Sequence, residues 1–371
     1  MIWNMYSQNM NANNQKRNKK KKRNFIFRGV SILCTIVFLV SGLCGCTAGG
    51  NGEKNLPKAQ KKLRVVTTIF PQYDFVRQIA GDNVSLTMLL KPGEETHSYE
   101  PTPQDIIAIQ NADLFIYVGG ENDEWVEDIL ESPEMEDVKR LRLVDCVGNI
   151  LAEEHVEGMK EERGHSHEDE EESHDEEEHF LHSAEETEEE HNEHIHTMDE
   201  HVWTSPGNAI DIVEHIAEEL CSLDSEHGQT YKDNAEAYET QLKELDTAFR
   251  DVVENAKSHT LLFGDRFPFR YFAAEYGLEY YAAFSGCASD TEPSAATMAF
   301  LINKVKEEHI PVVLKMELSN DNIANAIAEA CDVPVKVFYS SHNISAKQFE
   351  AGVTYLDLMK ENVETLKEAL R

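Results

Sequence analysis

The stretch LRVVTTIFPQYDFVRQIAGDNVSLTMLL, residues 63–90, predicts one strand–helix–strand unit. Residues 63–70 are apolar and β-branched, a composition that favours a strand. Pro71 suits the first turn of a helix, where its missing N–H would have no partner, and Gly81 is a natural helix stop. Residues 84–90 form the next strand. Short connections between such elements predict a parallel sheet covered by helices.

The same alternation continues along the chain in two runs. In the first run we expect helices at 103–111 and 125–130 and strands at 114–119 and 141–146. In the second we expect strands at 260–263, 278–284, 311–317 and 335–339, and helices at 268–276, 294–309, 322–330 and 346–370. Both runs contain the pattern F-P-x-x-x-F, beginning at Phe70 and at Phe267. The sequence therefore predicts an α/β protein with two lobes, each a parallel sheet flanked by helices.

A segment without Gly or Pro, residues 230–256 (TYKDNAEAYETQLKELDTAFRDVVENA), separates the two runs. Its apolar residues recur every three or four positions, the period of one helical face. A helix of this length spans about 40 Å and could join the lobes as a rigid strut. We expect a first lobe at 62–228, a linking helix at 229–257 and a second lobe at 258–371.

The N-terminal segment has the pattern of a secretory signal. Residues 16–28 are strongly basic and residues 29–44 are nearly all apolar, an apolar run too short to span a membrane comfortably. Leu43-Cys44-Gly45-Cys46 resembles a bacterial lipoprotein cleavage site, which predicts a signal peptide at 1–45, a lipid on Cys46 and a tether at 46–61. The alternative is an uncleaved N-terminal anchor. Both place the protein on a membrane, outside the cytoplasm.

Charge and cysteine content restrict the class of partner. The formal net charge is −35, which disfavours nucleic acid, because phosphate binding needs a basic surface, and weakly favours a cation. Four cysteines lie beyond the signal, namely Cys146, Cys221, Cys287 and Cys331, without a C-x-x-C motif. Spacing alone does not decide whether they form disulfides.

Residues 153–200 consist mostly of Glu and His. Such a segment buries too little apolar surface to offset the entropy of ordering it, so we predict a disordered insertion in the first lobe. Its histidines are expected to bind zinc weakly; those assigned to this low-affinity loop are His165, His167, His174, His179, His182, His191, His194 and His196. The alternative is an acidic linker that binds nothing.

Three further histidines lie where loops of the two lobes should meet. Ligands of open parallel sheets bind beyond the carboxyl ends of the strands. His97 and His342 each follow a predicted strand, and His201 precedes Val202 and Trp203, which should anchor it to the folded lobe. Imidazole suits zinc, and three nitrogens with a water or a carboxylate complete a tetrahedron. We therefore expect a metal site in the cleft between the lobes.

Residues 65–119, with the His97-x-Tyr-Glu-Pro-Thr-Pro motif, resemble the solute-binding lipoproteins of bacterial zinc and manganese ABC importers. The D-x-H-V-W motif at His201 and the Glu292-Pro293-Ser294 motif match the same family, and the resemblance covers about residues 62–371. It implies that His97 and His201 are metal ligands. It also implies an acidic, His-rich loop typical of zinc members.

The chain departs from the family at one expected ligand. A third histidine usually begins a stretch like H-x-A-F-x-Y-F, but Arg266 occupies that position here. Arginine stays protonated and cannot bind a cation. His342 is the predicted replacement from the second lobe, and Glu317, at the end of a predicted strand, is the alternative ligand.

These patterns predict an extracytoplasmic zinc-binding protein, expected to be a monomer, that delivers Zn²⁺ to the permease of a membrane ABC transporter and is not an enzyme. One alternative is a manganese carrier, although manganese prefers more oxygen ligands. Another is a zinc hydrolase, but no H-E-x-x-H motif supplies a general base. The last is a metal-buffering adhesin, which would lack a single tight site.

Overall fold

The computed structural model describes residues 62–94, 99–120, 123–159, 198–286 and 292–371. These residues belong to one compact unit, Lys61–Arg371. The predicted lipid site Cys46, His97 and the eight loop histidines lie outside the described residues. No helix within the described ranges is both long and apolar enough to cross a membrane.

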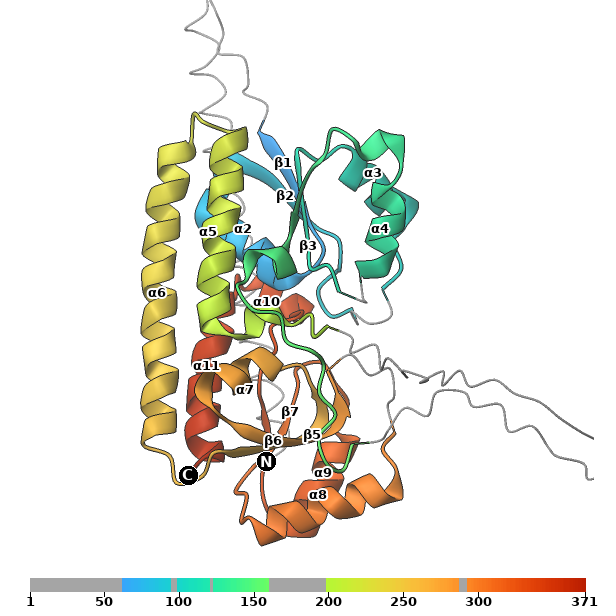
Figure 1. The fold of residues 1–371 in the computed structure, drawn as a ribbon, viewed down its shortest axis with the longest axis vertical. Coiled ribbons are helices and arrows are strands. Elements are labelled where there is room, and N and C mark those ends of the chain that lie inside the picture. The colour runs from blue at the N-terminus through green and yellow to red at the C-terminus, as the bar shows by residue number, and fades with distance from the viewer. Residues whose placement is uncertain (1–61, 95–98, 121–122, 160–197, 287–291) are drawn as a thin grey trace, which may run out of the picture. The chain divides into compact units, whose positions relative to one another are not determined.

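Two four-stranded sheets, parallel throughout, form the centre of the two lobes (Figure 1). The first has the order β2-β1-β3-β4 and contains β1 (Leu63–Thr67), β2 (Val84–Met88), β3 (Leu114–Tyr117) and β4 (Lys139–Arg142). The second repeats that order as β6-β5-β7-β8, with β5 (Thr260–Phe267), β6 (Glu279–Ser285), β7 (Val313–Lys315) and β8 (Val335–Val337). The predicted repeat and parallel α/β class are confirmed.

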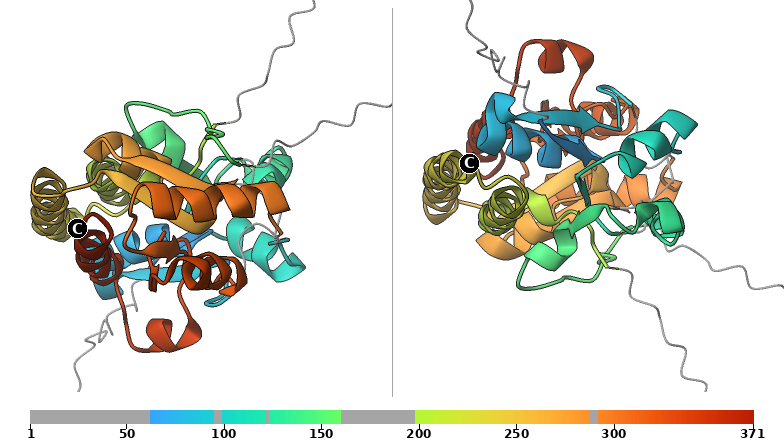
Figure 2. Two further views of the ribbon diagram at one scale, coloured as in Figure 1. Left: turned by 90° about the horizontal axis from the view of Figure 1, so that it is seen from below. Right: turned by 90° about the horizontal axis from the view of Figure 1, so that it is seen from above.

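Helices cover both faces of each sheet (Figure 2). In the first lobe they are α2 (Phe70–Ala80), α3 (Pro103–Gln110) and α4 (Glu124–Leu130), and in the second α7 (Arg270–Tyr276), α8 (Ala295–Glu307), α9 (Asn322–Cys331) and α11 (Tyr355–Ala369). The short helix α10 (Ala346–Glu350) contacts α2 instead, through the rings of Phe349 and Tyr73. Successive strand residues face opposite sides, so buried Val65 and Val66 belong to different hydrophobic clusters. This double burial explains why the inner strand β3, with the sequence LFIY, is apolar throughout rather than alternating.

The predicted linking helix is α6 (Gly228–Glu254), which packs against α5 (Pro206–Leu223) and α2 in one half and against α11 in the other (Figure 1). Its buried face carries Tyr231, Tyr238, Leu242 and Phe249. One hydrophobic cluster includes residues of both sheets together with these helices. The lobes are thus joined by continuous packing as well as by a covalent link.

Two predicted elements differ from the structure, and one observed helix was not predicted. The strand expected at 141–146 is β4 followed by a 3-10 helix, Leu143–Cys146, whose apolar residues are buried beside α5 instead of in a sheet. The single helix expected at 346–370 is two, α10 and α11, because Gly352 takes a positive φ of 75° between them. Helix α5 was not predicted at all. The proposed boundaries at 62–228, 229–257 and 258–371 stay a prediction.

Residues at both ends of the predicted insertion are part of the folded unit. Glu154 forms an ion pair with Arg270 at 3.0 Å and accepts a hydrogen bond from the Tyr280 hydroxyl at 3.0 Å. Met198 pairs with Ala152 in an isolated β-bridge. The prediction of a disordered insertion at 153–200 is therefore wrong for residues 153–159 and 198–200, and it stays a prediction for residues 160–197, which lie outside the described residues. The described cysteines, Cys146, Cys221 and Cys331, are free thiols.

Candidate metal centre

His201 lies at the point where the chain enters α5. It precedes a short 3-10 helix, Val202–Thr204, and Ser205 caps α5 by accepting a hydrogen bond from the Asn208 N–H at 3.1 Å. The side chains of His201, Val202 and Trp203 have no exposed surface. The predicted apolar anchor next to His201 is thus present, and it holds the imidazole inside the protein.

The Asp199 carboxylate orients the His201 ring. Its Oδ1 lies 3.0 Å from His201 Nδ1 and accepts a hydrogen bond from the His201 backbone N–H at 2.9 Å. Burial lowers the pKa of His201, but the charge and hydrogen bond of Asp199 outweigh it, so the pKa is raised. A carboxylate that accepts a hydrogen bond from Nδ1 selects the tautomer in which the Nε2 lone pair can bind a metal. Metal-binding histidines commonly have such a carboxylate partner.

His342 lies in a constrained loop after β8. Ser341 has a positive φ of 60°, and Glu317 accepts hydrogen bonds from the Ser340 backbone N–H at 2.7 Å and the Ser340 hydroxyl at 2.8 Å. The amide of Asn343 donates to the backbone oxygens of Lys91 and Glu94, both at 2.8 Å. The loop that carries His342 is therefore bonded to the first-lobe loop that leads into residues 95–98, which include His97.

The fold brings His201 and His342 together although 140 residues separate them. Their ring centroids lie 5.2 Å apart at an interplanar angle of 89°. Trp203 packs against His342 with a centroid distance of 4.9 Å and donates its indole N–H to the Ser340 carbonyl at 2.9 Å. Two of the three predicted histidines are therefore neighbours, one from each lobe.

Glu200 joins this pair, and sequence reasoning did not identify it. Ligand atoms of Glu200, His201 and His342 all lie within 4.8 Å of one another. Glu200 is only 1% exposed. The one sequence signal for Glu200 was its position directly before the anchored His201. Adjacent side chains need not point to the same place, so this position alone did not identify Glu200 as a candidate ligand.

Glu317, the predicted alternative ligand, binds the Ser340 backbone and hydroxyl in this structure. Burial raises its pKa to about 7, although these hydrogen bonds oppose the shift. Glu317, His342 and Arg266 line one cavity of about 160 Å³. Glu317 is therefore close to the site, and its role as a ligand remains a prediction.

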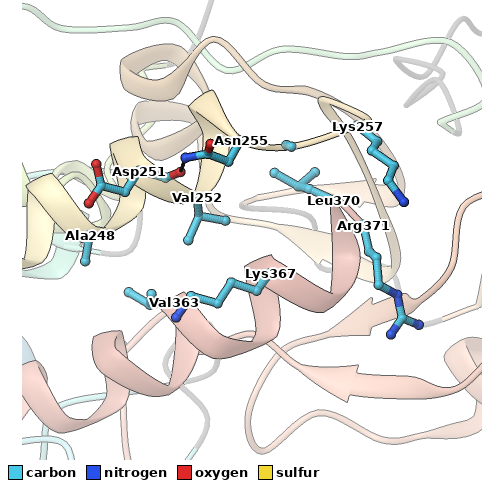
Figure 3. Close-up of a pocket in the computed structure, with 10 residues that line it drawn as sticks. Ala248, Asp251, Val252, Asn255, Lys257, Val363, Lys367, Leu370 and Arg371 are labelled. Atoms are coloured by element: carbon cyan, nitrogen blue, oxygen red, sulfur yellow. Dashed lines mark hydrogen bonds between the residues drawn. The ribbon is translucent and has the colours of Figure 1, made fainter.

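A larger cavity, of about 480 Å³, lies between the end of α6 and α11 (Figure 3). Its walls include Val252, Val363 and Leu370, and its charged residues are Lys257, Lys367 and Arg371 with one carboxylate, Asp251. No histidine or cysteine is among its lining residues. That composition does not suit a divalent cation, which leaves the group around His201 and His342 as the metal-site candidate in the described part of the chain.

Two parallel α/β lobes joined by a long helix, with buried imidazoles from both lobes in contact, define a two-lobed solute-binding protein. The chain belongs to the ZnuA family, described as zinc-uptake complex component A periplasmic, whose profile matches residues 65–369. The resemblance found in the sequence is confirmed.

Two sequence relatives illustrate the family. The zinc-binding lipoprotein AdcA of Streptococcus pneumoniae is 32% identical over 314 residues, 85% of this chain and 57% of AdcA. The chain thus spans little more than half the length of AdcA. The high-affinity zinc uptake system protein ZnuA of Bacillus subtilis is 32% identical over 335 residues, 90% of this chain and 94% of that protein.

The fold is also similar to that of a solved structure, the Zn(II)-bound ZnuA-like domain of Streptococcus pneumoniae AdcA. The TM-score is 0.63 at 28% identity, and the match covers 83% of this chain and 99% of that domain. The similarity therefore concerns the whole two-lobed unit rather than one sheet.

Proposed function

We propose that this protein captures Zn²⁺ outside the cytoplasm and delivers it to the permease of a membrane ABC transporter. The observation that carries the proposal is the contact between the buried rings of His201 and His342 from opposite lobes. One relative is named for zinc binding and another for zinc uptake, which supports zinc as the metal and uptake as the process. The expected third histidine is His97, in the loop to which Asn343 is bonded.

Zinc is favoured over manganese because imidazole nitrogens suit zinc, whereas manganese prefers sites made of oxygen ligands. The role proposed is carriage rather than catalysis. A catalytic zinc keeps one coordination position open for water or substrate, whereas buried protein ligands from two lobes can enclose the ion. We further propose that the protein acts as a monomer held to the membrane by a lipid on Cys46.

Zinc affinity, measured by competition with a chromophoric chelator, tests the site. His201→Ala and His342→Ala should each weaken tight binding by about 100-fold or more, because removing a group that supports a metal ligand already costs 10–100-fold. His215→Ala is the matched control, since His215 lies on α5 and bonds the Asp211 carbonyl. Parent-like affinity in both site variants would contradict the proposal.

Zinc uptake tests the physiological role. Cells that lack the protein should accumulate less ⁶⁵Zn²⁺ under zinc limitation, and the parent protein should restore uptake. The His201→Ala protein should not restore it. Undiminished zinc uptake with lost manganese uptake would favour the manganese carrier instead.

A further inference from the structure

We infer that Glu200 is a direct zinc ligand, taking the place of the histidine that Arg266 replaces. This inference rests on the proposed function. It assigns to the site one carboxylate oxygen from the first lobe, beside His201 and opposite His342. The cargo would then bind to a mixed nitrogen and oxygen site instead of a purely imidazole one.

Distance supports the assignment. The ligand atoms of Glu200, His201 and His342 lie within 4.8 Å of one another. In a zinc tetrahedron with bonds of 2.0–2.1 Å, ligand atoms are about 3.4 Å apart. Each ligand atom therefore needs to move by about 1 Å or less toward a common centre, which side-chain adjustment can provide.

The backbone explains how two consecutive side chains converge. The Val202 N–H donates a hydrogen bond to the Glu200 carbonyl at 2.8 Å, which closes a tight turn around His201. In an extended strand the side chains at 200 and 201 would point to opposite faces. The turn removes that restriction, so both can face the second lobe.

Gly120 provides the space that Glu200 occupies. A Cβ atom at position 120 would lie 2.0 Å from Glu200 Oε2 and 2.4 Å from Glu200 Cβ. Gly120 follows β3, at the carboxyl edge of the first sheet where ligands of parallel sheets bind. The absence of a side chain there thus allows Glu200 its buried position beside the two histidines.

Three other carboxylates near the site make hydrogen bonds to neighbouring groups. Asp199 bonds the ring and backbone of His201, Glu317 bonds Ser340, and Asp123 accepts hydrogen bonds from the backbone N–H groups of Val118 and Gly119. Burying a carboxylate costs free energy that a bound cation can offset. Within the described residues, Glu200 is the carboxylate grouped with both histidines.

The test compares Glu200→Gln with Glu214→Gln in the full chain. Glutamine keeps the size of each side chain and removes its charge. Glu200→Gln should weaken zinc binding about 100-fold and change the visible absorption spectrum of the Co²⁺-substituted protein, which reports the ligand set. Glu214→Gln, the matched control on the exposed surface of α5, should stay within about threefold of the parent with an unchanged Co²⁺ spectrum, because it removes no group near the site.

A second variant covers the case in which Glu200→Gln does not fold. Glu200→Asp keeps the charge but is one methylene shorter, so it should fold and bind zinc about tenfold more weakly. Parent-like affinity and an unchanged Co²⁺ spectrum in Glu200→Gln, or in Glu200→Asp if only that variant folds, would overturn the assignment. His201→Ala and His342→Ala serve as reference. If they lose zinc while the Glu200 variants do not, only this inference fails; if they also keep it, the proposed function fails.

Discussion

The indole N–H of Trp203 donates a hydrogen bond to the carbonyl of Ser340 at 2.9 Å. The bond links the segment after His201 to the segment before His342, so it connects the two halves of the candidate site. The Trp203 carbonyl in turn accepts a hydrogen bond from the Tyr355 hydroxyl at 2.7 Å. The positions of the two histidines are thus set by buried bonds between the lobes.

Trp203→Phe should weaken zinc binding without unfolding the protein. It keeps an aromatic ring against His342 and removes the donor to Ser340, a net loss of about 1 kcal/mol. Chelator competition should show about a fivefold lower zinc affinity, the equivalent of that energy. Trp125→Phe is the control, because the Trp125 Nε1 makes no hydrogen bond within the described residues. Equal affinities in the two variants would show that the bond does not position the site.

Removing the Glu317 side chain should destabilise the fold. In Glu317→Ala the Ser340 backbone N–H, which donates to Glu317 at 2.7 Å, loses its acceptor. A buried donor left without an acceptor costs about 1–3 kcal/mol. Chemical denaturation of the zinc-free protein should show a loss of this size in the free energy of unfolding. A loss below about 0.5 kcal/mol would mean that the loop relaxes to find another acceptor.

Gly264→Ala should lower the free energy of unfolding, because β5 and α9 are in close contact at position 264. A Cβ at position 264 would lie 2.5 Å from the Cα of Ala324, a backbone atom that moves only with its helix. Overpacking of this kind typically costs about 1–3 kcal/mol. Gly148→Ala is the matched control, since a Cβ there would meet nothing within 4 Å. Thermal unfolding should separate the two variants; similar melting temperatures would contradict the predicted contact.

Asp224 should make stability depend on pH at the corner between α5 and α6. It accepts hydrogen bonds from the His227 ring and the Tyr231 hydroxyl, both at 2.8 Å. Burial opposes ionisation, but these bonds outweigh it and lower the Asp224 pKa below its usual 3.8. The resulting stabilisation is present above pH 3.8 and is lost as pH falls through the folded-state pKa.

Asp224→Asn should therefore lower the free energy of unfolding at pH 7, by about 0.5 kcal/mol once solvent screening is included. The difference from the parent should shrink as pH falls below 3.8 toward the folded-state pKa, because Asp224 then becomes protonated in both states. Denaturation curves of both proteins at pH 7, 5 and 3 measure this difference in the free energy of unfolding. A difference that stays constant down to pH 3 would assign the effect to shape rather than charge.

Deleting residues 160–196 should leave the tight zinc site and reduce the number of zinc ions bound. The histidines of this segment are expected to bind weakly, since a flexible chain must be ordered at each binding event. The deletion keeps Glu154, whose ion pair with Arg270 belongs to the folded unit. Titration calorimetry should show the weak phase disappear and the tight phase persist. Loss of the tight phase would place part of the site within the deleted segment.

Sequence periodicity predicted most of the fold for a simple physical reason. Strands buried on both faces are continuously apolar, and a long helix with one buried face repeats every three to four residues, so both leave a local signature. The repeated β–α order, the linking helix α6 and the anchoring of His201 by Val202 and Trp203 followed from such signatures. The apolar residues of Leu143–Cys146 pack beside α5 instead of in a sheet, so the same reasoning extended the strand β4 too far along the chain.

The sequence by itself thus determined the parallel α/β class, the family motifs and the loops that carry His201 and His342. Tertiary structure alone decided that these two rings meet, that Glu317 bonds Ser340, and that Glu200 joins them in the space left by Gly120. Local sequence specifies the conformation of a segment, but the distance between side chains far apart in the chain depends on how the two lobes pack. At this site that packing selects the groups that can bind one ion.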